Sequence, residues 1–519
     1  MARIVNYSVN NPGYTIYHRA ALGGLGATVR SWGNHQPKGV DARVTADGIV
    51  LKWGDDLSDD DAIRRILAAS FKLTNDNLIE LPGQSVAPDA EDLRLAIHNA
   101  LTGTFLQHNK MRPAPAGEKG ARAFILKSAD DETGVILTYK PVGRYAHQDA
   151  QKTGLLDQTQ AKKSGTRRIL PLVAKIPQCC VPGAMGGATD LEALAEDALL
   201  LMFLMVACPV FTVRSRARAE KTQFCVVVPD VRDVLSFSRA LSRIAARSQN
   251  TRRFTNTFLG RVVGGAEEAA LRFIIDIEVE DSLSSRSVAG CVAVSMGKVA
   301  WDKNQINRSS SIRVRRSYPE IGVFHAANAH LGMSRLIKKS DGSGFAVPSS
   351  PVPELTAANL AADRHWCAHF RTLVDNKKDF LQMCYAQRGL KAMKEAVKDA
   401  DDQAVIRTFH KAWEMTMGAL GDRATRDGLS FEHLADRQRE RMRNAILRTK
   451  TSGTLAAWFL RFCADATKGA SLAPLRDESQ RIRTFIFNHR NFERFQNLCL
   501  FALVSYGSDE PKTLTEGRK

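Results

Sequence analysis

Residues 340–354 read SDGSGFAVPSSPVPE, and this stretch separates two parts of the chain that differ in character. Serine, glycine and proline dominate it and offer few side chains that pack, as is typical of a linker. Before it, strand-like and helix-like patterns alternate, whereas after it apolar residues recur at helical spacing. The sequence therefore predicts the α+β fold class, with a mixed α/β body at 1–339, a linker at 340–354, an all-α helical bundle at 355–508 and a disordered tail at 509–519.

Helical periodicity is clearest in the middle of the predicted bundle. Four apolar side chains follow one another every four residues there, which places them along one face of a helix: Val405, Phe409, Trp413 and Met417. Similar spacing, with few β-branched runs, continues through the rest of this part of the chain. We expect helices at 356–373, 377–398, 402–420, 430–449, 453–466 and 476–505.

The body opens with local signals of defined structural meaning. In ARVTADGIVLKW at 42–53, β-branched residues flank Asp47-Gly48, and Asp-Gly is a strong turn signal, so the segment predicts a β-hairpin. Ser58, followed by three aspartates, predicts the N-cap and first turn of a helix. We expect further strands within 121–145 and at 169–175, 209–214, 223–229, 272–280 and 287–301, and helices at 189–207 and 230–247.

The charge balance is the unusual feature of the composition. Among 519 residues there are 73 lysines and arginines but 55 aspartates and glutamates, which gives a net charge of +18. A surplus of this size opposes compaction by self-repulsion and favours a polyanionic partner. Charge alone does not distinguish DNA, RNA and an anionic membrane, and a basic protein kept soluble by its charge is the alternative.

Neither a membrane partner nor a secreted protein is expected. The longest apolar run, at 198–213, is shorter than the about 20 residues of a spanning helix and is interrupted by Pro209. The N-terminal segment MARIVNYSVNNPGY lacks the apolar region of a secretory signal. The nine cysteines are scattered and form no CxxC pair, which favours buried thiols in a reducing cytoplasm over a structural zinc site. We therefore expect a cytoplasmic protein.

Cations gather in three segments of the body. The densest is KVAWDKNQINRSSSIRVRR at 298–316, and the others are a polar loop at 146–168 and the segment 243–253. Cations hold phosphates at any sequence, whereas asparagine and glutamine amides can also contact base edges. One such run is usually a solvated face, but three in one domain favour contact with DNA. The predicted DNA-binding residues are Lys162, Lys163, Arg167, Arg168, Arg252, Arg253, Lys303, Asn304, Gln305, Asn307, Arg308, Arg313, Arg315 and Arg316.

The predicted bundle carries arginines of its own, interleaved with phenylalanines. We expect the phenylalanines at 485, 487, 492 and 495 to lie in the core. The arginines either line the exposed side of the bundle or form a groove that follows a single nucleic-acid strand. The residues predicted for the groove are Arg437, Arg441, Arg481, Arg483 and Arg490.

Signatures of catalysis are weak. The sequence contains no P-loop, no GxSxG and no HExxH motif. His365 and His369 are spaced one helical turn apart, but no carboxylate lies in register to complete a metal site. We therefore expect no catalytic residue, no metal and no cofactor. A nuclease whose acidic residues converge only in the fold is an alternative, as is a general RNA-binding scaffold.

Two segments resemble a known family. NPGYTIYHRAALGGLGATVRSW at 11–32 and AIRRILAASFKLTNDNLIELPG at 62–83 are similar to the first two blocks of the large subunit of type I CRISPR complexes (Cascade), in the Myxan variety grouped with type I-B. The resemblance implies a body that binds the 5′ end of a guide RNA and the short motif that flanks double-stranded target DNA. It also implies a bundle that holds the displaced single strand and so stabilises the R-loop. Other Cascade subunits, and a recruited helicase-nuclease or transposition proteins, would be the partners.

The residues of the first segment have their own physical interpretation. Tyr14, Tyr17, His18 and Arg19 precede a glycine-rich stretch, so stacking groups and a cation stand next to residues that allow close backbone approach. This favours an RNA end, with Tyr17, His18 and Arg19 as the RNA-binding residues. Tight helix packing against the glycines explains the same pattern equally well.

In this family a small subunit can start inside the same gene. Met383 and Met393, which follow the predicted linker, are the candidate starts. The alternative is that both are core methionines, since methionine commonly fills gaps in a core.

Overall fold

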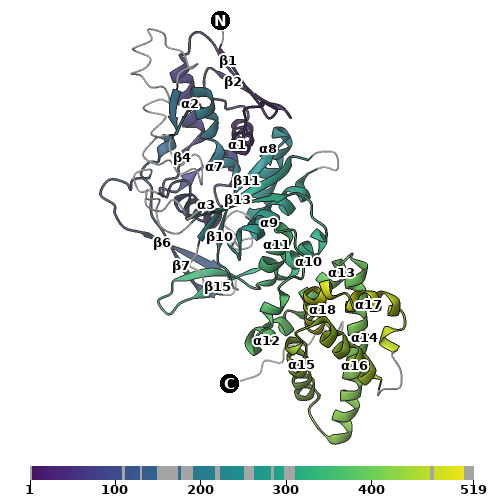
Figure 1. Cartoon of the computed structure of the whole chain (residues 1–519). Coiled ribbons are helices and arrows are strands. Elements are labelled where there is room, and N and C mark those ends of the chain that lie inside the picture. The colour runs from purple at the N-terminus through teal and green to yellow at the C-terminus, as the bar shows by residue number, and fades with distance from the viewer. Residues whose placement is uncertain are drawn as a thin grey trace. The chain divides into compact units, whose positions relative to one another are not determined.

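The computed structural model describes residues 3–107, 112–128, 131–148, 173–176, 191–216, 223–250, 262–281, 286–296, 310–467 and 473–507 (Figure 1). The chain divides into two compact units. The first unit comprises 1–316 and 333–349, and the helical unit comprises 317–332 and 350–519. The predicted fold class is confirmed, because an α/β region is followed by a run of helices.

The first unit starts with a small antiparallel sheet. Its strands β1 (Arg3–Ser8), β3 (Gly48–Trp53) and β2 (Val40–Val44) lie in the order β1-β3-β2. The Asp-Gly turn joins β2 to β3, as the sequence predicts. Helix α2 (Asp59–Ser70) follows, and the Asp61 N–H donates to Ser58 Oγ at 3.1 Å, which confirms the predicted N-cap.

A five-stranded sheet forms the centre of the first unit. The strand order is β12-β10-β11-β13-β14, and every pair is antiparallel except β10 with β12. The strands are β10 (Val210–Val213), β11 (Gln223–Val231), β12 (Val262–Val263), β13 (Val288–Met296) and β14 (Ser310–Arg315). Helices α1 (Ile16–Trp32), α8 (Val234–Asn250) and α9 (Ala266–Glu280) pack around this sheet (Figure 1).

Helix α9 corrects one sequence prediction. The β-branched run at 272–280 predicts a strand, but these residues form the second half of α9. The helix buries one face against β13 through Ala270, Phe273 and Ile277. Inside this packing Arg272 Nε donates to Glu268 Oε1 at 2.7 Å, one helical turn away. Tertiary packing of a helical face therefore outweighs the local β-propensity.

Helix α1 is packed unusually closely by its neighbours. A Cβ on Gly23 would lie 2.7 Å from the Phe237 ring, and one on Gly26 would lie 2.5 Å from Val234 Cγ1, both at the start of α8. A Cβ on Gly24 would lie 2.1 Å from the Phe203 carbonyl oxygen. The three glycines therefore serve tight packing, which was one of the two interpretations of this pattern.

Shorter elements complete the first unit. They are β4 (Lys72–Leu73), β5 (Ile79–Glu80), α3 (Glu91–Thr102), β6 (Arg122–Ser128), β7 (Asp131–Tyr139), β8 (Val173–Ile176), β9 (Leu191–Leu194), α6 (Ala195–Leu201), α7 (Leu204–Ala207), β15 (Ser334–Lys338) and β16 (Gly344–Pro348). The helix expected at 189–207 is thus split, since β9 precedes it. The stretch 340–354, expected to be a linker, holds the β15–β16 turn, strand β16 and the start of the next helix.

His98, on α3, is buried and contacts two backbone groups of the first unit. Its Nδ1 accepts from the Ile79 N–H at 3.1 Å, and its Nε2 lies 2.9 Å from the Lys140 carbonyl oxygen. Burial lowers the pKa of His98 to about 4. The neutral imidazole is therefore the form that the fold stabilises.

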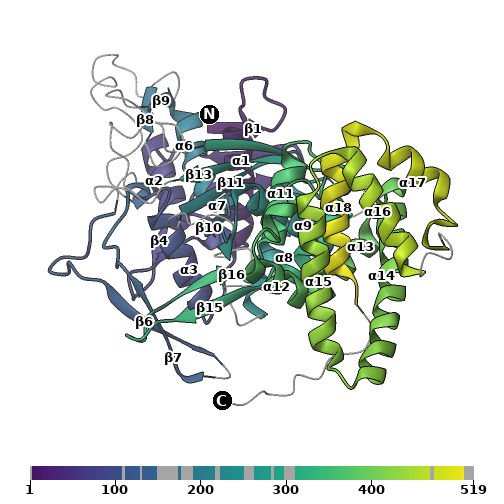
Figure 2. The ribbon, with the colours of Figure 1, turned by 60° about the horizontal axis from the view of Figure 1, so that its bottom comes forward.

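Helices form most of the helical unit, but some of their bounds differ from those predicted (Figure 2). The helix expected at 356–373 ends at residue 361, those expected at 377–398 and 476–505 are each divided in two, and the helix at 321–331 was not predicted. The helices are α10 (Ile321–Leu331), α11 (Val352–Ala361), α12 (Lys377–Tyr385), α13 (Gln387–Ala396), α14 (Ala400–Asp427), α15 (Phe431–Arg448), α16 (Ser452–Ala466), α17 (Ser479–Ile486) and α18 (Phe492–Ser505). The predicted stripe on α14 faces the core, since all four of its apolar residues are buried. In Figure 2, α14 and α15 run side by side as the two longest helices of this unit.

A fully buried carboxylate, Asp402, connects three segments of the helical unit. Asp402 Oδ2 accepts from Trp366 Nε1 and lies 2.7 Å from His365 Nε2, while Asp402 Oδ1 accepts from Arg494 Nε at 2.9 Å. His365 therefore has a structural partner, and it lies outside any regular helix. In the described part of the chain no three His, Cys, Asp or Glu side chains gather as a metal site requires.

The first helix of the helical unit comes from an unexpected place in the chain. Helix α10 belongs to this unit, although β15 and β16, which follow it, belong to the first unit. Helix α10 packs on α13, where a Cβ on Gly389 would lie 2.3 Å from Leu331 Cδ2. Met383 and Met393 are both buried here. Within the described residues, no helix is both long and apolar enough to span a membrane.

Candidate nucleic-acid interface

One buried carboxylate in the first unit holds three arginines from separate segments. Asp230, at the end of β11, lies 2.6 Å from Arg19 Nε of α1 and 3.2 Å from an Arg232 guanidinium nitrogen. A nitrogen of Arg313, on β14, lies 3.9 Å from the same carboxylate. We call these four residues the Asp230 cluster. Three positive charges against one negative charge leave a local surplus of about two.

The three arginines differ in how firmly they are held. The Arg19 side chain is 16% exposed and also donates to the Tyr14 carbonyl oxygen at 2.8 Å, so it is anchored. Arg232 and Arg313 are 53% and 77% exposed and meet Asp230 only at its second oxygen. Exposed ion pairs of this kind are weak, so both guanidinium groups are available to a phosphate.

An aromatic pair lies beside the Asp230 cluster at the start of α1. The Tyr14 and His18 rings stack with their centroids 5.0 Å apart and an interplanar angle of 12°. His18 also lies at the N-terminus of α1, where its Nδ1 is 2.9 Å from Thr15 Oγ1. Burial lowers the pKa of His18, and Arg19 adds to this effect while Asp197 opposes it. His18 is therefore a neutral ring at pH 7, and such a ring can stack on a base.

Acidic groups limit this surface on one side. Burial, together with the charges of Asp197 and Glu196, raises the pKa of Tyr14. Tyr17, which the sequence predicts for RNA binding, is half-buried, and burial raises its pKa, with a further contribution from Cys208. Of the three predicted RNA-binding residues, Arg19 therefore lies in the Asp230 cluster and His18 stacks on Tyr14 beside it.

The three described arginines of the densest predicted run have different environments. Arg313 and Arg315 lie on the same face of β14 because they are two residues apart on one strand. Arg316 is instead bound by Glu278 at 3.2 Å and by Asp281 at 2.9 Å. Two carboxylates neutralise Arg316 within the fold, so we leave it out of the proposed interface.

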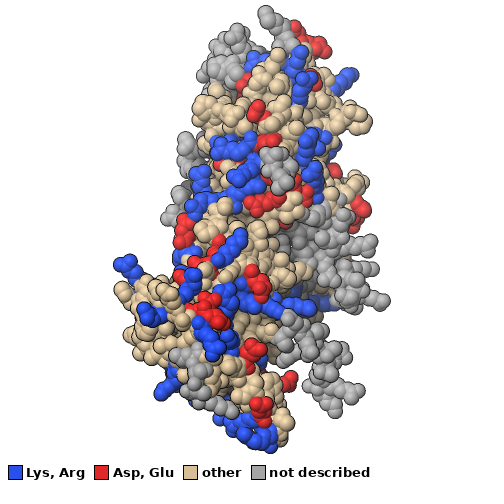
Figure 3. Space-filling model, turned by 90° about the vertical axis from the view of Figure 1, so that its right-hand side faces the viewer, with Lys and Arg blue, Asp and Glu red and all other residues tan. Residues whose placement is uncertain are grey.

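All the other predicted DNA-binding residues lie outside the described part of the chain. They are Lys162, Lys163, Arg167, Arg168, Arg252, Arg253, Lys303, Asn304, Gln305, Asn307 and Arg308. On the face drawn in Figure 3, lysine and arginine side chains alternate with acidic ones. On that face basic and acidic side chains are therefore interspersed.

The predicted single-strand residues of the helical unit are spread over several elements. Arg437 and Arg441 are exposed on α15, Arg481 and Arg483 on α17, and Arg490 just before α18. Arg437, Arg441 and Arg448 follow one face of α15, and in the described part of the chain none of them has an ion-pair partner. Arg481 differs, because it pairs with Asp401 at 3.0 Å.

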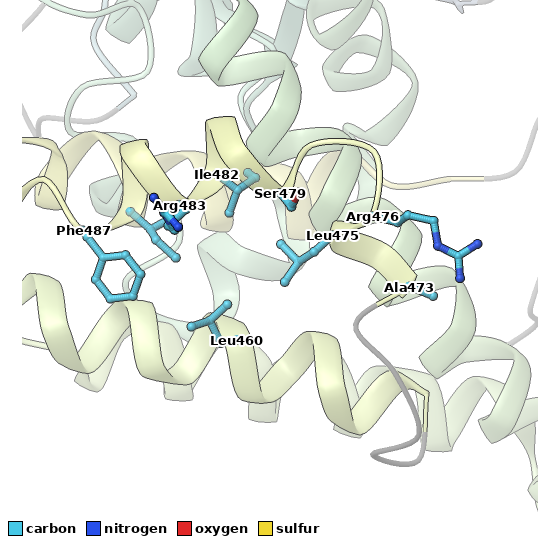
Figure 4. A pocket seen from close by; sticks show the side chains of 9 residues that line it. Leu460, Ala473, Leu475, Arg476, Ser479, Ile482, Arg483 and Phe487 are labelled. Carbon is cyan, nitrogen blue, oxygen red and sulfur yellow. The ribbon is translucent and has the colours of Figure 1, made fainter.

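A pocket of about 470 Å³ lies beside Arg483 (Figure 4). Its wall is mainly apolar, including Leu460, Ile482 and Phe487, while Arg476 points away from these side chains. Phe487 is 61% exposed, which corrects the expectation that it lies in the core. Phe485 and Phe495 are buried, as predicted. An exposed ring next to an arginine is a platform on which a base can stack.

Sequence reasoning missed the residue that organises the first site. Asp230 comes after the apolar residues QFCVVVP of one strand. A single carboxylate at the end of such a strand was the sequence signal that could have indicated a site. Its partners Arg19 and Arg313 are 211 and 83 residues away in the chain, so no local pattern connects them.

Comparisons with known proteins give family matches in both units and one relative that covers most of the chain. Residues 6–202 match the DevT N-terminal domain, and residues 393–518 match the DevT C-terminal domain. The chain is also 23% identical over 535 residues to a Myxococcus xanthus (strain DK1622) protein described as CRISPR-associated protein Cas8a1/Csx13. That similarity covers 95% of this chain and 87% of the relative.

Proposed function

We propose that this chain, a homologue of a Cas8a1/Csx13 protein, is the Cas8-like large subunit of a CRISPR surveillance complex. Its role is to bind nucleic acid, in company with other subunits of the complex. The body binds the guide RNA end and the motif that flanks double-stranded target DNA. The subtype we propose is the Myxan, type I-B-like one, in the cytoplasm.

The Asp230 cluster is the observation that carries this proposal. It gathers Arg19, which the sequence assigns to RNA, and Arg313, which the sequence assigns to DNA, on one carboxylate. One surface with a surplus of cations next to a stacked aromatic pair suits a junction, where a guide strand and a duplex lie close together. Phosphate contacts would give affinity there, and base pairing by the guide would read the target sequence.

The helical unit has a separate role in this proposal. The α15 arginines and the Arg483–Phe487 surface would hold the displaced single strand, with phosphates on the arginines and a base on the ring. This supports stabilisation of the R-loop rather than its cleavage. A recruited helicase-nuclease, or transposition proteins, would then act on the opened DNA.

The chemistry of the Asp230 cluster supports a binding role rather than catalysis. The Asp230 cluster has one carboxylate, already neutralised by three arginines, so it offers neither a free base nor a pair of metal ligands. A metal-dependent nuclease is the alternative, and a general RNA-binding scaffold is another.

Salt-dependent binding of the full chain to a duplex tests the proposal. The logarithm of affinity should fall by about 0.9 per logarithm of salt for each phosphate contact, so R232A/R313A should lower the slope by up to about 1.8. R64A/R335A, which removes two cations on α2 and β15, is the matched control. Salt-independent binding would refute the proposal. Cleavage of the duplex with magnesium, blocked by a chelator, would favour the nuclease, and binding of RNA alone would favour the scaffold.

A further inference from the structure

Helix α1 carries a second arginine in line with the one that reaches the Asp230 cluster. Arg19 and Arg30 are eleven residues apart, which on an α-helix is three turns and about 16 Å on the same face. Gly23 and Gly26 lie between them on this face and press against Phe237 and Val234. The face that carries both arginines therefore runs along the contact with β11 and α8.

Arg30 meets two further arginines at the other end of this contact. An Arg30 guanidinium nitrogen lies 3.4 Å from Ser238 Oγ on α8. Arg239 and Arg243 are exposed on α8 one turn apart, and Arg243 donates to the Glu280 carbonyl oxygen at 3.3 Å. Burial lowers the pKa of Arg30, and the charges of Arg239 and Arg243 lower it further.

Among the described residues, no acid balances this second group. In the described ranges, no carboxylate lies within ion-pair distance of any of its three arginines. The C-terminal end of α1 attracts a cation, which accounts for Arg30. The end of α1 does not account for Arg239 and Arg243, which lie in α8. Their charges both act on the Arg30 guanidinium.

We propose that Arg30, Arg239 and Arg243 form a second phosphate-binding position, and that one duplex DNA backbone contacts both this position and the Asp230 cluster, which lie at opposite ends of the buried α1–α8 contact. The inference rests on the proposed nucleic-acid function. Along one strand of a duplex, phosphates rise about 3.4 Å each, so about 16 Å corresponds to roughly five nucleotides.

The composition of the second position favours a duplex over an unpaired strand. The described contacts of the arginines at this position are polar, since Arg30 lies 3.4 Å from Ser238 Oγ and Arg243 donates to the Glu280 carbonyl oxygen. Guanidinium groups bind phosphate oxygens, and no described aromatic contact at this position offers a base a stacking platform. The position therefore holds backbone at any sequence.

The test compares two double variants of the full chain on 20-bp duplexes of unrelated sequence. R239A/R243A should weaken binding at least tenfold at 100 mM salt, equally for all sequences, and should lower the salt slope by up to about 1.8. Combined with R232A/R313A, the losses should multiply, because the two positions lie about 16 Å apart and share no partner. R64A/R335A is again the control, and unchanged thermal unfolding shows that each variant is folded.

The outcomes separate this inference from the proposed function. If R232A/R313A weakens duplex binding and R239A/R243A does not, the second position is refuted and the proposed function stands. If the parent protein does not bind a duplex in a salt-dependent way, both fail. If R239A/R243A weakens binding of a guide RNA but not of the duplex, the assignment to DNA is overturned.

Discussion

Replacing Asp230 with asparagine should lower the stability of the first unit and raise its affinity for DNA. If Asp230 had only a structural role, the substitution would lower stability without raising affinity. The asparagine keeps one carbonyl oxygen, which can still accept from Arg19 Nε. It presents an amide group to Arg232 and Arg313 in place of the second carboxylate oxygen. The negative charge in the middle of three arginines is lost.

The stability cost comes mainly from Arg19. A charge-assisted hydrogen bond is worth about 1.5–3 kcal/mol and a neutral one about half of this, so the loss at Arg19 is about 0.75–1.5 kcal/mol. The exposed pairs with Arg232 and Arg313 add at most about 1 kcal/mol each. Alanine also removes the acceptor and leaves Arg19 mostly buried and without this partner, so D230A should cost more, about 2–4 kcal/mol.

The gain in affinity follows from the charge removed. A unit charge about 6 Å from a phosphate contributes about 0.7 kcal/mol in water, and screening at 0.1 M salt reduces this to about 0.4 kcal/mol, or about twofold in affinity. The gain should disappear near 1 M salt, where the screening length is about 3 Å.

Two measurements check this prediction. Hydrogen exchange of peptides from α1 and β11 reports the local free energy of opening, and fluorescence anisotropy with a labelled duplex at two salt concentrations reports affinity. R313A, which leaves Asp230 in place, should weaken binding without the stability loss. Weaker binding by D230N, to the same extent as by R313A, would refute the reasoning.

Three further predictions concern the fold. D402N should lower the stability of the helical unit by about 3–5 kcal/mol, because it breaks a buried ion pair. D401N, in an exposed pair on the same helix, should lower it by at most about 1 kcal/mol. Urea unfolding followed by tryptophan fluorescence compares the two variants. Gly24→Ala should prevent folding of the first unit, whereas Gly418→Ala, with open space around its Cβ, should raise the unfolding temperature through a gain of about 0.5–1 kcal/mol, as circular dichroism can show. The pKa of His98 is about 4 in the folded chain and about 6.5 in the unfolded chain, so stability should fall as the pH drops from about 6.5 to about 4; H98Q should flatten this dependence in urea titrations at several pH values.

Local signals in the sequence predicted local structure well. The Asp47-Gly48 turn, the Ser58 cap and the four-residue spacing on α14 each depend on neighbours in the chain, and the structure contains all three. The prediction at 272–280 was wrong because β-branched residues carried more weight than the helical spacing of Ala270, Phe273 and Ile277. That spacing was present in the sequence.

The organisation of the candidate site could not be predicted in the same way. Nothing near Arg19 or Arg313 in the chain indicates that both reach Asp230, because the sheet and α1 bring them together only in the fold. The same limit applies to Arg316, whose two carboxylate partners lie on and just after α9. Composition indicated a polyanionic partner, but which cations remain available to it depends on tertiary pairing.

The position of α10 in the chain matters for anyone who wishes to exchange parts between related proteins. The backbone passes between the two units three times, after residues 316, 332 and 349, so the helical unit is not a cassette that a single cut can release. A chimera joined at 350 would combine one parent's α10 with the other parent's α13, and Leu331 would have to fit against a foreign residue at position 389. Recombination within 317–349 would thus be expected to separate α10 from the helices on which it packs. Successful grafts should carry residues 317–332 along with everything after 350, as a split insert.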